Sequence, residues 1–565
     1  MRFSKISTWA VTTAVASAGR GPFLEKINDS TWVIGNDHWN VTQGALYATK
    51  LYWDAVPGAD LVGSAAGHYV GYEDGENNLK FTNATIASRG SNYIDVSFSA
   101  AAGDFHWVVF DDLTGAYQYF VNRALPDISI LRTLWRLAPE HFPNGRTHLK
   151  DEPLPDFALY ANATNVQDET WQLADGSFIT KYDWSNAVRD RDFYGIYGPR
   201  AGSWYIHPTT EYFNSDHLSQ TLTIHRESKT GDSVQLNVVQ DTSHFRVGQK
   251  VAQPAGKVWG PWLWYLNDGN VEDAAQRRKE EVKRVPYTWF EDAAYHSRGG
   301  IQGTLALSDG RAASNAVVFL GDADVTIRPS IQGKDYYYTT YADDEGRFTF
   351  DKVRAGSYAV YAWSNGGKLG DVYTNFTAPV TVSANATADL GRLSWEVPRG
   401  RKRIFQVGEF DKKASGFENG GAPYRHGAAA DSPANLTFVV GESNDSDWYY
   451  ASSAIGRWTI EFDVPAAEAE ANRTAVLSVS LAGYSQSGAL DVEVNGRVYG
   501  SLGKDVLASD PALYRSGKTS GEWRFVQYEV GAGVLEAGRN TVGFAVTRYT
   551  QWRGFMWDSI ILEWA

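Results

Sequence analysis

Gly202-Ser-Trp-Tyr-Ile-His-Pro208 and Gly260-Pro-Trp-Leu-Trp-Tyr-Leu-Asn267 are the aromatic runs that decide the fold of this chain. Both lie in the stretch from Trp171 to Asn267, and their apolar, aromatic composition is typical of β-strands. The same stretch contains Lys181 and the histidines His207, His217, His225 and His244. Aromatic rings beside cationic groups suit an acidic carbohydrate, although aromatic strand residues are more often part of a core.

The composition indicates a large β-rich protein. The chain has 565 residues, of which 14% are aromatic, and a length of this kind predicts roughly two to four domains. The formal net charge of -14 argues against nucleic acid and against an acidic membrane surface as partners. An acidic substrate would therefore need a local basic cleft. The absence of cysteine excludes thiol catalysis and cysteine metal sites.

The N-terminus has the pattern of a signal peptide over residues 1–18. Met1-Arg-Phe-Ser-Lys5 is basic, an apolar run follows, and Ala16-Ser-Ala18 resembles a cleavage site. We therefore expect a secreted, extracellular protein with no membrane span. Glycosylation is expected at the Asn-X-Ser/Thr sequons headed by Asn28, Asn40, Asn83, Asn162, Asn375, Asn385, Asn435, Asn444 and Asn472.

The first predicted domain covers residues 19–297 and is a β-sandwich with a C-terminal helix. Runs such as Tyr93-Ile-Asp-Val-Ser-Phe98 and Phe105-His-Trp-Val-Val-Phe110 alternate or stay apolar as strands do. Residues 271–285 are rich in helix-forming side chains, and Pro286 ends that helix. We expect the segment after the helix to dock onto the sandwich.

Two smaller β-domains are predicted after the first one. Residues 298–397 contain short strands separated by turns, which favours a fibronectin III-like sandwich. Residues 398–565 have the size and strand pattern of a jelly-roll, a common shape for carbohydrate-binding modules. The fold class is therefore all-β.

Several motifs accompany the two aromatic runs. They include Val33-Ile-Gly-Asn-Asp37, Gly103-Asp-Phe-His-Trp-Val108, Leu113-Thr-Gly-Ala-Tyr-Gln-Tyr-Phe-Val-Asn-Arg-Ala-Leu-Pro126 and Val166-Gln-Asp-Glu-Thr-Trp-Gln-Leu173. Taken together, over nearly the whole chain after residue 18, they resemble fungal rhamnogalacturonan lyases of polysaccharide lyase family 4, the rhamnogalacturonate lyase B type. The resemblance implies a large mutarotase-like super-sandwich, a fibronectin-like domain and a jelly-roll. It also implies β-elimination at O4 of galacturonate in rhamnogalacturonan I, which leaves an unsaturated uronate.

The resemblance implies roles for four residues of the first domain. Lys181 matches the catalytic lysine and is expected to act as the base. Arg132 and Arg136 match arginines that bind the galacturonate carboxylate, and their even spacing on one strand puts them on the same face. Tyr265 matches an active-site tyrosine. Trp264 beside it is a candidate for sugar contact that the resemblance does not imply, and a tryptophan in a strand is more often part of the core.

The catalytic acid is harder to assign, because the position of the family's histidine is Asn270 in this chain. Compared with the family, this chain has extra residues between Lys181 and Tyr265, and three other histidines lie in or near that insertion. We expect His244, in Thr242-Ser-His-Phe245 at a strand end, to be the acid. His217 and His225 stay open as alternatives and as substrate-binding residues.

Catalysis is expected to need no metal, because no cluster of side chains has metal-ligand spacing. A structural calcium ion in the third domain is expected from the resemblance, with Glu409 and Asp558 as oxygen ligands. The expected partner is the acidic plant cell-wall polysaccharide rhamnogalacturonan I, and the chain is expected to be a monomer.

Three other functions compete with the lyase. A glycoside hydrolase could use the carboxylates of Asp168 and Glu169, or of Asp183 and Asp192. Asp168 and Glu169 are adjacent, so on a strand they would face opposite ways. A non-catalytic carbohydrate-binding protein would use the aromatic surface alone, and a sugar epimerase is supported only by analogy of fold.

Overall fold

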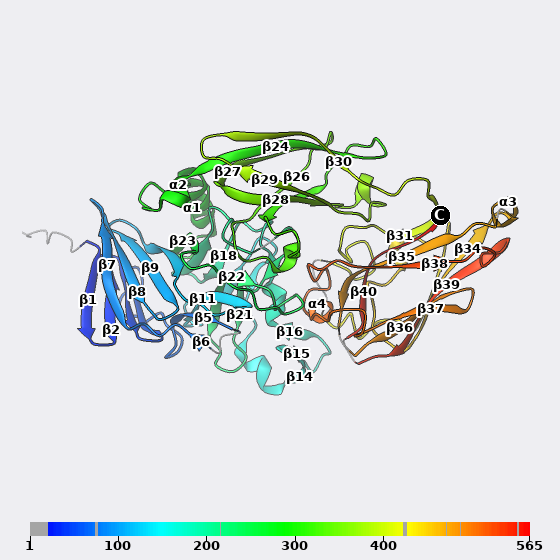
Figure 1. Ribbon diagram of the computed structural model, residues 1–565. Helices are drawn as coiled ribbons and strands as arrows, with labels where there is room; N and C mark the ends of the chain where they lie inside the picture. Colours follow the sequence, from blue (N-terminus) through cyan, green and yellow to red (C-terminus); the bar gives the residue numbers. More distant parts are fainter. Residues whose placement is uncertain are drawn as a thin grey trace, which may run out of the picture.

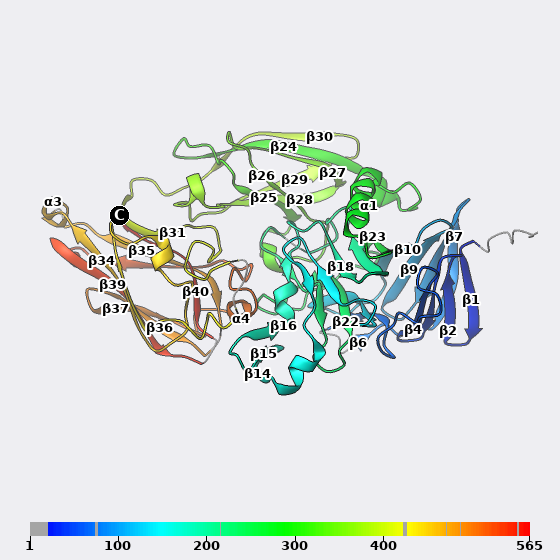
Figure 2. The same ribbon diagram turned by 180° about the vertical axis from the view of Figure 1, so that it is seen from behind.

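The computed structural model describes residues 21–565 except residues 74–76, 215, 422–425, 471, 486 and 551–552. The predicted signal peptide lies outside the described residues. Nearly all secondary structure is β-strand, which confirms the predicted fold class (Figure 1). The C-terminal domain lies at the opposite end of the molecule from the first strands, β1 (Phe23–Asn28) and β2 (Thr31–Gly35) (Figures 1 and 2).

Two large sheets form the first domain. The nine-stranded sheet has the order β13 (Asp151–Pro153), β12 (Asn144–Arg146), β18 (Phe193–Tyr197), β19 (Gly202–Ile206), β23 (Val258–Asn267), β10 (Gly115–Asn122), β9 (Gly103–Phe110), β8 (Tyr93–Ser99) and β7 (Asn83–Arg89). The five-stranded sheet has the order β21 (Ile224–Arg226), β22 (Ser233–Asp241), β11 (Ile130–Leu137), β5 (His68–Tyr72) and β6 (Asn77–Asn78). A four-stranded sheet of β1, β2, β3 (Trp39–Gly44) and β4 (Ala48–Trp53) packs on the same core.

The core between the two large sheets explains the aromatic run of β23. Alternate residues of a strand face opposite sides, so Trp262 and Trp264 enter the core while Leu263 and Tyr265 face outward. Trp264 stacks on Trp135 of β11, with ring centres 4.7 Å apart. The aromatic run therefore joins the two sheets of the sandwich.

A helix covers the outer face of the nine-stranded sheet. Helix α1 (Val271–Arg284) begins where the Asn270 side chain accepts a hydrogen bond from the Asp273 amide, and Pro286 follows its end. Ala274 of the helix and Phe290 after it are buried in one cluster with the outward side chains of the sheet. The predicted helix and the docking of the segment after it are confirmed.

Two sheets make up the second domain. One has the order β27 (Arg347–Arg354), β24 (Arg298–Leu307) and β30 (Thr387–Trp395). The other has the order β26 (Tyr338–Tyr341), β25 (Val317–Asp322), β28 (Gly356–Trp363) and β29 (Phe376–Val382). Apolar side chains of both sheets share one core, as in a fibronectin-like sandwich.

The third domain is a larger sandwich of two sheets. The first contains β31 (Lys402–Gly408), β40 (Phe555–Trp564), β35 (Ala475–Tyr484) and β38 (Arg524–Val530), with β33 (Ala451–Ser452) paired to β40. The second has the order β32 (Asn435–Val439), β34 (Gly456–Val464), β39 (Gly538–Arg548), β36 (Ala489–Val494) and β37 (Arg497–Leu502). The short helices are α2 (Ala293–His296), α3 (Ala466–Glu470) and α4 (Ala512–Arg515). No helix of the described ranges is long and apolar enough to cross a membrane.

A buried ion cluster joins the first domain to the second. The Glu211 carboxylate accepts hydrogen bonds from Arg298, at 2.7 and 2.9 Å, and from Arg354, at 2.8 Å. Burial alone would raise the pKa of Glu211, but the two arginines hold it at about 2, below its ordinary value of 4.5. The ionised carboxylate therefore stabilises the junction.

We expect the substitution Glu211→Gln to lower the free energy of unfolding by about 3–5 kcal/mol, because it leaves two buried arginines without their counter-charge. In the unsubstituted chain this contribution is present above the unfolded pKa and is lost as the pH falls from about 4.5 toward 2. Chemical unfolding followed by tryptophan fluorescence measures both effects. Glu345→Gln, at an exposed glutamate of the second domain, is the control, and equal stability of the two variants would contradict the prediction.

Candidate active site

A cavity of about 590 Å³ lies between the five-stranded sheet and the third domain. Its floor is the outer face of that sheet, where Arg132, Leu134 and Arg136 of β11 all line the cavity. Leu134 pairs with Tyr69 of β5 on one side and with Leu236 of β22 on the other, and both also line it. The prediction that the two arginines share a face is confirmed.

Lys181 enters the cavity from a small excursion of the chain next to the sheet. The three-stranded sheet of β14 (Thr164–Gln167), β15 (Thr170–Gln172) and β16 (Phe178–Thr180) leads into the 3-10 helix η2 (Lys181–Trp184). Thr180 caps that helix by accepting a hydrogen bond from the Tyr182 amide at 3.2 Å. Lys181 is therefore the first residue of a helical turn. The strand position expected for it is wrong.

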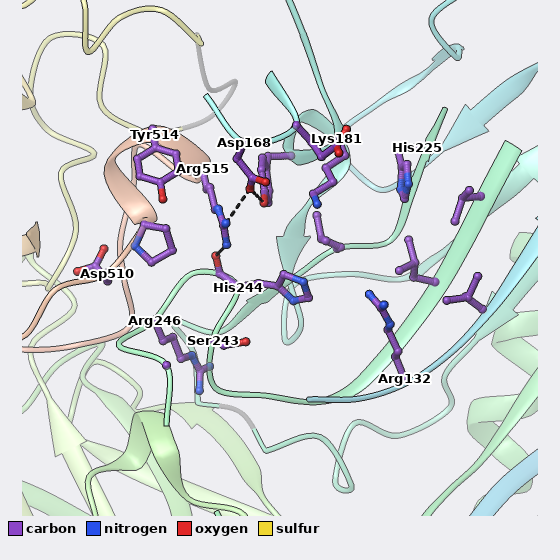
Figure 3. Close-up of a pocket in the computed structure, with 18 of the residues that line it drawn as sticks. Arg132, Asp168, Lys181, His225, Ser243, His244, Arg246, Asp510, Tyr514 and Arg515 are labelled. Carbon is purple, nitrogen blue, oxygen red and sulfur yellow. Dashed lines mark hydrogen bonds and ion pairs between the residues drawn. The ribbon is translucent and has the colours of Figure 1, made fainter. Parts of the chain in front are cut away.

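The surroundings of Lys181 disfavour its charged form. Burial lowers its pKa from the ordinary value of 10.5, and the nearby Arg515 and Arg132 act in the same direction. Asp168 and Glu169 oppose this effect only in part. In Figure 3 the Lys181 side chain points toward His244 and Arg132. A lysine in this setting is suited to lose its proton and act as a base.

His244 follows the end of β22 and is held by Asp241. One Asp241 carboxylate oxygen accepts a hydrogen bond from the His244 amide, and the other lies 3.0 Å from Nδ1 of its ring. Although Asp241 is buried, His244 and neighbouring amides lower the pKa of its carboxyl, so it accepts and Nδ1 donates. The His244 ring lines the cavity, and Nε2 is the ring nitrogen that Asp241 does not engage. Nε2 is therefore the atom that can exchange a proton with a bound substrate.

The third domain closes the cavity with Arg515 of helix α4. Its guanidinium donates to the Asp168 carboxylate at 2.7 Å and to the His244 carbonyl oxygen at 2.7 Å (Figure 3). Tyr182 donates to the same Asp168 oxygen. Asp168 and Arg515 are 347 positions apart in the sequence, so no local pattern could have indicated this contact. One arginine thus links the segments that carry Lys181 and His244.

We expect Arg515→Met to lower kcat by about 10²-fold, because a small displacement of His244 or of the Lys181 turn disturbs the reacting geometry. Arg515→Lys should recover part of the loss, since it keeps the charge beside Asp168. Steady-state kinetics on the expected polysaccharide substrate measures the effect, with the exposed Arg497→Met in the same domain as control. An unchanged kcat for Arg515→Met would contradict a positioning role.

His225 and Arg136 line the same cavity but differ from the residues above in their chemistry. His225 lies on β21, and burial together with Lys181, Arg136 and Arg132 lowers its pKa well below the ordinary value, so its ring is neutral. The Arg136 guanidinium lies 3.2 Å from Glu227 and 3.3 Å from Asp232. These two ion pairs hold Arg136 against the wall of the cavity. Arg132 points toward the centre, so it is the arginine placed to meet a carboxylate (Figure 3).

Two predicted site residues, Tyr265 and Trp264, do not line the cavity. The Tyr265 hydroxyl donates to Asp273 of helix α1 at 2.9 Å, behind the nine-stranded sheet. Trp264 is fully buried in the core and cannot contact a sugar. Asn270, at the position matched to the family's histidine, caps helix α1. Spacing alone could not tell which face of β23 these side chains occupy, and the predicted roles of Tyr265 and Trp264 are wrong.

His217 also lies outside this cavity. Its ring is buried against Tyr341 of the second domain, with ring centres 4.7 Å apart, and it lines a different cavity. The prediction that it competes with His244 for the role of acid is therefore wrong, because the ring does not reach the space around Lys181.

Glu409 and Asp558, the expected calcium ligands, both make hydrogen bonds within the third domain or to the second. The Glu409 carboxylate accepts a hydrogen bond from the Gly367 amide at 2.8 Å. Asp558 is buried and accepts from the amides of Asp411 and Lys413 and from the Ser480 hydroxyl. Burial and the neighbouring Asp411 raise the pKa of Asp558 to about 8. Among the described residues, no group of three or more His, Asp or Glu side chains could hold a metal ion.

The carboxylates proposed for a hydrolase are poorly placed for that chemistry. Asp168 and Glu169 lie in a tight turn and not in a strand, and Asp168 has a φ of 44°. Both residues can therefore line the cavity. Burial opposes the charge of Asp168, but Arg515 and Lys181 lower the pKa of its carboxyl. A general acid needs the opposite shift. Asp192 is held by both terminal nitrogens of Arg146, and Asp183 lines the other cavity.

The described lining of the cavity is basic although the protein is acidic. Six cationic side chains face four carboxylates there. The cations are Arg132, Arg136, Lys181, Arg246, Arg515 and Arg553, and the carboxylates are those of Asp168, Glu169, Glu227 and Asp510. A local excess of positive charge attracts an acidic substrate in spite of the net charge of -14.

A basic cleft on a β-sandwich, closed by a jelly-roll, suits an enzyme that acts on an acidic carbohydrate. Comparison with protein families gives the same class in finer detail. Residues 308–390 match domain II of polysaccharide lyase family 4, and residues 403–562 match its CBM-like domain III. Two of the three domains therefore match polysaccharide lyase family 4, and the protein is a polysaccharide lyase.

Individual relatives agree with this assignment. A "Rhamnogalacturonate lyase" of Dickeya dadantii is 29% identical, over 80% of this chain and 77% of its own length. A "Rhamnogalacturonate lyase B" of Emericella nidulans is 24% identical, over 86% of each chain. Among solved structures, a family 35 carbohydrate binding module is 18% identical and covers 20% of this chain and 69% of its own. Its TM-score of 0.13 is too low to support an argument.

Proposed function

We propose that the enzyme cleaves the rhamnose–galacturonic acid backbone of rhamnogalacturonan I by β-elimination. The names of its relatives supply the substrate. The observation that carries the proposal is the convergence of Lys181, His244 and Arg132 on one basic cavity. These side chains are the base, the acid and the carboxylate-binding group that the reaction requires.

The proposed reaction begins at C5 of the galacturonate. Its proton is weakly acidic because the carbon is adjacent to the carboxylate, and Arg132 neutralises the charge that develops there. The neutral amine of Lys181 takes the C5 proton. The electron pair of the C5–H bond becomes the C4=C5 double bond, and the C4–O4 bond breaks. Nε2 of protonated His244 donates a proton to the departing O4, so no water is consumed.

We expect Arg132→Met to lower kcat/KM by about 10²- to 10³-fold, because it removes the positive charge that stabilises the carboxylate in the transition state. Arg132→Lys should fall between this variant and the wild type, since lysine keeps the charge but loses the planar two-point contact. Initial rates of formation of the unsaturated product measure the effect. A kcat/KM equal to that of the wild type would contradict the role of Arg132.

The products of rhamnogalacturonan I distinguish the proposed function from its rivals. Mass spectrometry should find oligosaccharides whose total mass equals that of the parent chain, with a dehydrated uronate at each new non-reducing end. Fragments that have each gained a water would indicate a hydrolase. Intact polysaccharide that still binds the protein would indicate a carbohydrate-binding protein.

The site of action is proposed to be extracellular, with the enzyme acting as a monomer and without a catalytic metal. The N-terminal pattern of residues 1–18 and the sequons support secretion. Eight of the nine sequon asparagines are exposed, and Asn40 is half-buried. Enzymatic removal of N-glycans from secreted protein, followed by mass spectrometry, tests which of these asparagines carry them.

A further inference from the structure

A second cavity of about 380 Å³ lies where the three domains meet. Each domain contributes to its lining: the first Asn186 and His217, the second Tyr341, and the third Lys518. Tyr182 and Arg515 line both this cavity and the catalytic one, with the guanidinium 4.8 Å from the centre of the tyrosine ring. A wall of two side chains therefore separates the two spaces.

The second cavity is lined by buried polar groups whose hydrogen bonds are not made. Asn186 is 2% exposed, and neither atom of its side-chain amide has a hydrogen-bond partner. Nδ1 of His148 also makes no hydrogen bond, and the His217 ring, which is 8% exposed, lies beside the Thr340 backbone. Buried polar groups in folded proteins nearly always have partners. Their concentration at one cavity indicates a bound polar molecule.

The charge at this cavity favours an anion. Lys518 is half-buried, and its ammonium makes no ion pair with any described residue. Burial lowers the pKa of Lys518, and the neighbouring Lys413 acts in the same direction, while Asp190 and Asp411 oppose them only in part. A bound anion would favour the charged form of Lys518. The carboxylates in the lining are those of Asp183, which lies 2.8 Å from His426, and Asp190, which is exposed.

The remaining walls fit a sugar ring. Tyr341, Leu149 and Leu218 supply apolar surface, and the Tyr341 ring packs edge-on against His217. Apolar walls with a few convergent polar groups are typical of small-molecule sites, and a volume near 400 Å³ is within their usual range of about 300–1,000 Å³. A pyranose offers apolar C–H faces to such walls and hydroxyl groups to the unpartnered Asn186 amide and to the imidazole rings of the lining.

We propose that the second cavity binds a uronate, an acidic pyranose whose carboxylate pairs with Lys518 and whose hydroxyls meet Asn186 and His217. The site binds without performing chemistry, and it is separate from the cavity that holds Lys181. The choice of galacturonate among uronates rests on the proposed function, whereas the acidic-sugar character rests on the cavity alone.

The test is a calorimetric titration of the full chain with galacturonic acid, and with galactose as the neutral counterpart. The background variant is Lys181→Met. We expect galacturonate to bind in two equivalents, one at each cavity. Lys518→Met should lower the affinity of the second cavity at least about tenfold, and Arg132→Met should lower the affinity of the catalytic cavity. Lys504→Met, at an exposed lysine of the same domain that lines neither cavity, should leave both equivalents unchanged.

A second variant guards against loss of folding. Asn186→Leu removes an amide that has no partner, so it should not lower the unfolding temperature. It should still lower the affinity of the same site as Lys518→Met does.

A single binding site that only Arg132→Met removes, or a second site that binds galactose as tightly as galacturonate, would overturn the inference. If Lys518-dependent binding persists but rhamnogalacturonan I gives no unsaturated product, the proposed function fails and the second site stands. If the unsaturated product forms and Lys518→Met binds galacturonate as the wild type does, the proposed function stands and the second site fails.

Discussion

Replacing Lys181 with methionine is expected to lower kcat by about 10²- to 10⁴-fold, the usual contribution of a general base. Methionine fills a similar volume but cannot accept the C5 proton. The wild-type rate should also rise with pH through a limb that lies below the ordinary lysine pKa of 10.5, because burial and the neighbouring arginines lower the pKa of Lys181. The rate of formation of the unsaturated uronate, followed as a function of pH, measures both effects.

Lys229→Met is the matched control for this experiment. Lys229 is an exposed lysine of the same domain and does not line the catalytic cavity, so its loss should leave kcat and the pH profile unchanged. Near-wild-type activity of Lys181→Met would contradict the assignment of the base. A loss of activity together with a large fall in unfolding temperature would assign Lys181 to the structure and not to the reaction.

Replacing His244 with glutamine is expected to lower kcat by about 10²- to 10⁴-fold, because glutamine cannot protonate the departing O4. The side chain can still fill the space beside Asp241. Asp241→Asn should cause a smaller loss, since His244 remains but loses the carboxylate that fixes Nδ1 as the donor. The same assay of unsaturated product measures both variants.

His225→Gln provides the comparison for His244. The His225 ring is neutral and lines the same cavity, so it is the remaining histidine near Lys181 that could replace His244 as acid. We expect the loss in His225→Gln to be much smaller than in His244→Gln. The opposite order would contradict the role of His244 and would assign the acid to β21.

Local patterns in the sequence were sufficient for the fold and for part of the site. The alternation in β23 and the helix-forming run before Pro286 both depend on near neighbours, and both are confirmed. The even spacing of Arg132 and Arg136 correctly placed them on one face, because residues two apart on a strand point the same way. The choice of Lys181 rests on the resemblance and not on a local pattern, and this residue lies in a helical turn and not in a strand.

Contacts between distant segments could not be predicted. Arg515 reaches Asp168 and His244 only because the third domain docks beside the five-stranded sheet, and nothing near residue 515 indicates that docking. Tyr265 was misplaced for a related reason, since an aromatic strand residue looks the same in sequence whichever side of a sheet it occupies. The unpartnered groups of the second cavity also become visible only in three dimensions.

Elimination at the cavity of Lys181, His244 and Arg132 is tested most directly by one measurement. Rhamnogalacturonan I is incubated with the wild type and with Lys181→Met, and ultraviolet absorbance and new reducing ends are followed in the same sample. The account predicts that absorbance from the conjugated double bond rises in step with the reducing ends for the wild type, and that both are lost in Lys181→Met. New reducing ends without any rise in absorbance would contradict it.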